Sequence, residues 1–130
     1  MIITTTDEAV RVGAGPSAAP PAAWTCLVRR GMLHSECESV EHWRLAPAAP
    51  LEATPRHGVE EAVLVLDGTL DLATASGERT LGAGALALLP HGGTARLTAG
   101  PRGARIVTVR ALAAPVTDRL PPRVPELIDT

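Results

Sequence analysis

A chain of 130 residues is long enough to close one hydrophobic core and too short for two independent ones. Its formal net charge of -2 provides no basic field for phosphate, and without Phe or Tyr it offers few stacking platforms, so we expect no nucleic-acid partner. The longest apolar run, residues 83–89, is far shorter than the roughly 20 residues that span a bilayer, so no membrane partner is expected. The N-terminus lacks a charged segment followed by an apolar one, which predicts a cytoplasmic protein.

Five residue types are missing, namely Lys, Asn, Gln, Phe and Tyr, while Ala, Arg, Gly and Pro abound. This bias is typical of a GC-rich bacterial genome. It excludes lysine Schiff bases, tyrosine acids and carboxamide oxyanion holes, and leaves His, Asp, Glu, Arg, Cys, Ser and Thr to act. Cys26 and Cys37 are too few for a disulfide framework and are predicted to be reduced thiols. The carboxylates Glu36, Glu38 and Glu41 are predicted to form a solvated edge.

In chain order, residues 1–23 are predicted to be an N-terminal strand followed by a proline-rich arm, because residues 13–23 carry three prolines and no apolar period. Residues 24–112 are predicted to form a β-barrel domain, and the prolines of residues 113–130 predict a tail without a long helix. Short apolar segments separated by glycine turns indicate strands at residues 24–29, 39–45, 62–66, 69–73, 85–89, 94–98 and 104–112. Residues 47–55 are predicted to break regular structure. This spacing is typical of an all-β sandwich or barrel.

Two spaced motifs fall within this series. His57, Glu61 after three intervening residues and Gly68 after six more resemble the first motif of the cupin family, with Pro55 in the place of its first histidine. Gly84 and Pro90-His91-Gly92 resemble the second motif, in which Ala95 and Ala99 stand in the places of a histidine and an asparagine. The resemblance covers roughly residues 38–112. It implies a single-domain, cupin-like jelly-roll barrel whose two antiparallel sheets enclose a cavity.

The same resemblance implies a depleted metal site. A typical cupin holds a divalent metal with three histidines and one glutamate, and here His57 and Glu61 remain of that set. Open catalytic zinc sites usually keep three protein ligands, so no tightly held metal is expected. Two weaker alternatives are a divalent ion loosely held by His57 and Glu61, and a set completed by His42 or His91.

Three further residues are candidates for binding a substrate. His91 lies in a turn four residues before the lost histidine ligand, at a position that would reach the rim of the pocket. His42 and Arg44 share one face of the 39–45 strand, opposite Trp43 and Leu45. If the polar face turns inward, His42 and Arg44 line the pocket; if Trp43 and Leu45 turn inward, they face solvent.

The leading functional hypothesis is a small-molecule-binding accessory enzyme of bacterial specialised metabolism that needs no tightly held metal. In it His57 is the general acid or base and Glu61 orients it or shares its proton, as isomerases, cyclases and dehydratases require. One alternative is a non-catalytic ligand-sensing module, and another is a metal-dependent oxygenase or lyase with non-standard ligands. A homodimer is expected, with the arms at residues 1–23 and 113–130 completing a neighbour's sheet.

Overall fold

The structure is a computed structural model, and it describes residues 1–12, 21–33, 36–53, 59–90 and 93–121. Within these ranges the chain forms eight strands and one short helix. The elements are β1 (Val10–Val12), β2 (Ala22–Arg29), β3 (Cys37–Leu45), β4 (Pro50–Ala53), β5 (Val59–Thr74), β6 (Gly77–Gly82), β7 (Leu86–Leu89), β8 (Ala95–Leu112) and α1 (Ala114–Thr117). The all-β prediction is therefore confirmed.

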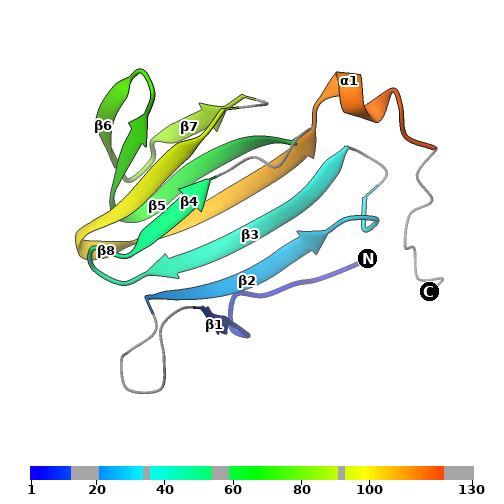
Figure 1. Ribbon diagram of the computed structural model, residues 1–130. Helices are drawn as coiled ribbons and strands as arrows, with labels where there is room; N and C mark the ends of the chain where they lie inside the picture. The colour runs from blue at the N-terminus through cyan, green and yellow to red at the C-terminus, as the bar shows by residue number, and fades with distance from the viewer. Residues whose placement is uncertain (13–20, 34–35, 54–58, 91–92, 122–130) are drawn as a thin grey trace.

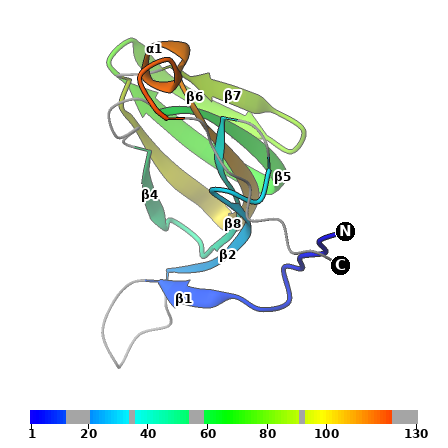
Figure 2. The same cartoon turned by 90° about the vertical axis from the view of Figure 1, so that its right-hand side faces the viewer.

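Two long strands, β5 and β8, run side by side through the middle of the molecule (Figure 1). Every strand pairing is antiparallel, and the main strand order is β1-β2-β3-β8-β5-β6. The first part of β5 pairs with β7, and its second part pairs with β6. Likewise β8 pairs with β4 in its first part and with β3 in its second. Because both long strands bend, these pairings form the two facing layers of a jelly-roll barrel (Figure 2).

The bends lie where the sequence predicted turns, so the prediction of separate strands 62–66 and 69–73, and 94–98 and 104–112, is wrong. Gly68 and Gly103 adopt φ of 75° and 76°, and Gly68 pairs with Ala104 across the two strands. A Cβ on Gly68 would collide with the carbonyl oxygen of Gly103. Glycine here lets two backbones approach closely while both strands continue around the corner.

The sequence analysis did not predict two of the strands. Residues 47–55 were expected to break regular structure, yet β4 lies within them and pairs with β8. Pro50 is the first residue of β4, which has β8 as its partner among the described strands, and proline is tolerated at the start of an edge strand. β6 was missed because Leu81 is its one large apolar residue, and Glu78, Arg79 and Thr80 before it are polar and exposed.

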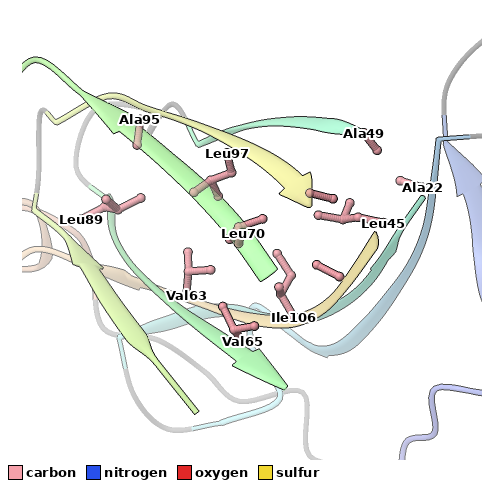
Figure 3. Close-up of a cluster of buried hydrophobic side chains, with 12 residues drawn as sticks. Ala22, Leu45, Ala49, Val63, Val65, Leu70, Leu89, Ala95, Leu97 and Ile106 are labelled. Carbon is pink, nitrogen blue, oxygen red and sulfur yellow. The ribbon is translucent and has the colours of Figure 1, made fainter. Parts of the chain in front are cut away.

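The core fills the space between the two layers (Figure 3). Alternate residues of β5 and β8 supply its centre, with Val63, Val65 and Ile106 fully buried beside Leu70 and Leu97. These side chains come from both sides of the Gly68 and Gly103 bends. One continuous apolar core therefore joins the two layers, as expected for a single domain of this length.

β1 pairs with β2 of the same chain, and α1 follows directly after β8. The described residues contain no helix that is long and apolar enough to cross a membrane.

Candidate functional site

The inner faces of β3, β5 and β8 carry a polar cluster at one end of the apolar core. Register places Glu61 beside Arg110 on β8, and places Thr108 on β8 beside Glu41 on β3. Glu61 is 3% exposed, Glu41 is 7% exposed and Thr108 is fully buried. Because cross-strand neighbours share a face, the antiparallel pairing alone brings these groups together.

Arg110 links the two carboxylates. Its Nε lies 3.5 Å from Glu61 Oε1, and its Nη1 lies 3.8 Å from Glu41 Oε1. Thr108 Oγ1 donates to Glu41 Oε2 at 3.4 Å, and Trp43 Nε1 donates to the same oxygen at 3.3 Å. The Arg110 side chain is 35% exposed, whereas the side chain of Glu61 is 2% exposed. The guanidinium therefore lies at the boundary between the two buried carboxylates and solvent.

Glu61 is the unusual member of this cluster. Its Oε2 is buried and has no hydrogen-bond partner among the described residues. Burial raises the pKa of the Glu61 carboxyl, the nearby Arg110 opposes that rise, and the charge of Glu41 adds to it. A buried carboxyl with a raised pKa and an open oxygen is suited to accept or donate a proton.

A hollow of about 970 Å³ opens between β6 and β7. Its lining includes Leu72 and Thr74 on β5, Arg79 on β6 and Leu89 on β7. Glu61 is not one of the lining residues, but its direct cross-strand partner Leu89 is, so Glu61 adjoins one wall of this hollow. The volume falls in the range of small-molecule sites.

Glu61 is the one predicted catalytic residue that the structure describes, and it lies on the inner face of the sheet. The predicted residues His57 and His91 lie outside the described residues. For His42 and Arg44 the structure selects the second alternative, because Trp43 and Leu45 pack with the core and the polar face turns outward. Neither His42 nor Arg44 is brought to Glu61.

That outward face is not uniformly solvated. Arg44 is exposed, but His42 is 3% exposed. On β2, the direct neighbour of His42 is the buried Thr25, whose Oγ1 donates to the backbone oxygen of Glu8 at 3.1 Å. The N-terminal segment therefore lies over this part of the sheet. Burial lowers the pKa of His42, and the charges of Arg105 and Arg44 lower it further.

The prediction of a solvated carboxylate edge holds for the exposed Glu36 but is wrong for Glu41, which lies inside the barrel. The signal was present, because period two places Glu41 on the same face as Trp43 and Leu45. Arg110 was missed for a related reason. It shares its face of β8 with the fully buried residues Ile106 and Thr108, but an arginine near the end of a strand is usually solvated.

A metal of the usual cupin kind does not fit the described residues. They contain no group of three or more His, Cys, Asp or Glu side chains arranged to hold an ion. The guanidinium of Arg110 already engages Glu61, and a second cation there would be repelled. Ala95 and Ala99, in the places of the family's histidine and asparagine, are buried members of the apolar core, which Figure 3 shows for Ala95.

Comparison with known proteins gives a clear result for the fold. No family model matches the chain, and no curated protein matches it. A predicted oxalate decarboxylase from Thermotoga maritima has a TM-score of 0.72 at 14% identity, over 87% of this chain and 100% of that chain. KdgF from Halomonas sp. gives 0.64 at 12% identity, over 89% and 97%. The Cupin_2 domain of an XRE family transcriptional regulator from Enterobacter cloacae gives 0.63 at 19% identity, over 72% and 98%. The chain therefore has the cupin fold.

Proposed function

We propose that the protein binds a small organic molecule in the hollow between β6 and β7 and uses Glu61 as a general acid or base on it. The observation that carries this proposal is the buried Oε2 of Glu61, which no described residue satisfies. A buried polar atom without a partner costs about 1 to 3 kcal/mol, and a ligand that shares a proton or hydrogen bond with it removes that cost.

The surrounding groups support this role. Arg110 fixes one oxygen of Glu61 and leaves the other oxygen open. Glu41 is held in turn by Arg110, Thr108 and Trp43, so the cluster is fixed by several contacts rather than by one. A positioned carboxyl of this kind supports proton transfers such as those of isomerases, cyclases and dehydratases. His57 remains a proposed partner of Glu61.

The proteins of similar structure include a predicted oxalate decarboxylase and a domain of a transcriptional regulator. The fold therefore occurs both in a predicted enzyme and in a regulator's domain, and fold alone does not choose between catalysis and ligand sensing. We favour catalysis because a ligand sensor does not require a titratable group with a raised pKa on its inner wall.

The test compares Glu61→Gln with Glu60→Gln, the neighbouring substitution whose side chain is exposed on the other face of β5. Ligand-observed NMR is run on both variants and on the wild type against a panel of hydroxy acids, lactones, sugar acids and amines. We expect at least one compound to bind and to be converted by the wild type and Glu60→Gln. Conversion by Glu61→Gln should fall at least about 100-fold, the typical contribution of a general acid or base.

Equal turnover in Glu61→Gln would overturn the acid-base role. Saturable binding without any product, unchanged by the substitution, would favour the ligand-sensing alternative. A panel that never binds the wild type would count against the hollow as a ligand site.

A further inference from the structure

The outer face of the sheet formed by β7, β5 and β8 is apolar and exposed. Leu88 is 72% exposed and Leu86 is 57% exposed on β7, and Val109 on β8 is 38% exposed. Monomeric proteins scatter exposed apolar side chains singly, whereas a contiguous patch marks an interaction site. The position of these residues in the sheet decides which case applies.

Strand register makes the patch contiguous. Leu64 lies between Leu86 on one side and Val107 on the other, and Ala62 lies between Leu88 and Val109. Side chains paired in this way are about 5 Å apart. These side chains form the outer apolar face, which consists of Ala62, Leu64, Leu86, Leu88, Val107 and Val109.

The face has both a protrusion and a depression. A groove of about 400 Å³ borders it, lined by Ala62, Leu88, Val109 and Ala111 together with Glu61. Leu88 is the most exposed of these residues. A surface with a matching knob and groove is self-complementary, which is the requirement for a two-fold interface between identical chains.

The size of the face fits the centre of such an interface. Three strands about 4.8 Å apart, each contributing about five residues of 3.3 Å rise, cover roughly 250 Å² of sheet. Stable interfaces bury about 800 Å² on each partner, with an apolar centre and a polar rim. The outer apolar face therefore supplies the centre, and the rim must come from the charged residues around it.

The charges at the rim are arranged so that opposite ends of the face can meet when two copies pack together. Exposed Glu60 lies at the beginning of β5, paired with Ala111 near the end of β8. Exposed Arg44 and Arg105 are paired with each other at the opposite end of the face, with Asp67 beside Arg105. A two-fold axis that is parallel to the sheet and perpendicular to its strands reverses the strand direction between the two copies. The acidic end of one copy then lies over the net basic end of the other.

We propose that two copies of this chain pack face to face through the outer apolar face, with Leu88 of each copy in the groove of the other. The N-terminal segment contacts the neighbouring part of the sheet through the hydrogen bond from Thr25 Oγ1 to the backbone oxygen of Glu8. Glu61 is among the residues that line the groove, so this interface borders the Glu61 cluster. Sedimentation tests the dimer and turnover tests the proposed acid-base role, so each proposal has its own measurement.

The first test is the mass of the full chain by sedimentation velocity over a range of concentrations. The wild type should sediment as a dimer of twice the 13.4 kDa chain mass. Leu88→Glu should shift it to a monomer with an unchanged circular dichroism spectrum, because each charge would be buried against the partner's alanines. Leu33→Glu, a 49% exposed leucine outside this face, is the matched control and should remain dimeric.

A charge exchange tests the proposed orientation. Glu60→Arg should weaken the dimer at least about tenfold, and combining it with Arg105→Glu should restore most of that loss. A wild-type monomer at every concentration would overturn the interface. A dimer that survives Leu88→Glu would show that another surface, such as the chain's arms, holds the two copies together. A failed charge rescue would overturn the reversed strand direction between the two copies.

Discussion

Arg110 Nε lies 3.5 Å from Glu61 Oε1, on neighbouring strands whose register places the two residues directly opposite each other. The pair differs from a surface ion pair in burial, because the Glu61 side chain is 2% exposed. Removing a partner from a buried charge costs far more than removing one from an exposed charge. This relationship makes Arg110 a positioning residue for the site and gives the first prediction.

Arg110→Met should destabilise the protein by about 1 to 3 kcal/mol, because Glu61 and Glu41 would be left buried without their shared cation. The matched control is Arg30→Met. Arg30 Nε lies at the same distance, 3.5 Å, from Glu38 Oε1, but the Arg30 side chain is 60% exposed. That change should cost about 0 to 1 kcal/mol. Urea denaturation measures both, and equal losses would contradict a special role for Arg110.

Glu61→Gln should change the pH dependence of stability. Burial raises the pKa of Glu61 in the folded protein, so the folded state holds this proton more tightly than the unfolded chain does. The stabilisation is complete below the ordinary glutamate pKa of about 4.3 and is lost as pH rises through the raised value. The difference in unfolding free energy between the wild type and Glu61→Gln should therefore shrink with rising pH.

The measurement is urea denaturation at closely spaced pH values, repeated on Glu36→Gln. That control changes an exposed carboxylate outside the Glu61 cluster and the outer apolar face, and its stability should follow the wild-type curve. A difference between the wild type and Glu61→Gln that grows as pH rises would show that Arg110 outweighs burial at this site.

Replacing His42 should change the pH dependence of stability in the opposite direction to replacing Glu61. Burial and the charges of Arg105 and Arg44 lower its pKa, so the unfolded chain binds this proton more readily. The associated stability is present above the unfolded histidine pKa of about 6.5 and is lost as pH falls through the lower folded value. His42→Gln should flatten the acid side of the stability curve between neutral pH and mild acid. Amide hydrogen exchange of the neighbouring Thr25 follows the same transition and should accelerate in the wild type alone.

The sequence was sufficient for the fold class, because short apolar segments and glycine spacing are local patterns that mark strands and the bends between them. The sequence did not distinguish a turn from a bend within a strand, because glycine is used in both. Gly68 was interpreted as a turn because a turn and a bend within a continuing strand both use positive φ. Only the partner backbone at Gly103 distinguishes them, and that contact is 35 residues away in the chain.

The same limit applies to the candidate site. Glu61 was predicted because its spacing from His57 and Gly68 is local in sequence. Glu41 and Arg110 were not, because their roles depend on which strand lies beside which. Alternation places Glu41 on the face of Trp43, but it does not say that this face also meets Arg110. Polar clusters assembled across three strands are therefore beyond single-sequence patterns.

Gly68→Ala should destabilise the protein by about 1 to 3 kcal/mol, because the new Cβ meets the carbonyl oxygen of Gly103 at a positive φ of 75°. Gly82→Ala is the control, since a Cβ there meets nothing within 4 Å and its φ is not in the left-handed region. It should be neutral or slightly stabilising. Thermal unfolding measures both, and a neutral Gly68→Ala would show that β5 and β8 can separate at the bend without cost.

Chelation tests whether a metal contributes to the site. The described residues do not fit the usual cupin ligand set, and the guanidinium of Arg110 already engages one oxygen of Glu61. We therefore expect dialysis of the untagged protein against a mild chelator to leave the melting temperature unchanged. Elemental analysis before and after should show less than one metal per chain.

A stoichiometric metal that survives dialysis, with a melting temperature that falls when a stronger chelator removes it, would show that residues outside the described ranges complete a ligand set with Glu61. Metal-assisted chemistry would then replace proton transfer by Glu61 as the leading mechanism.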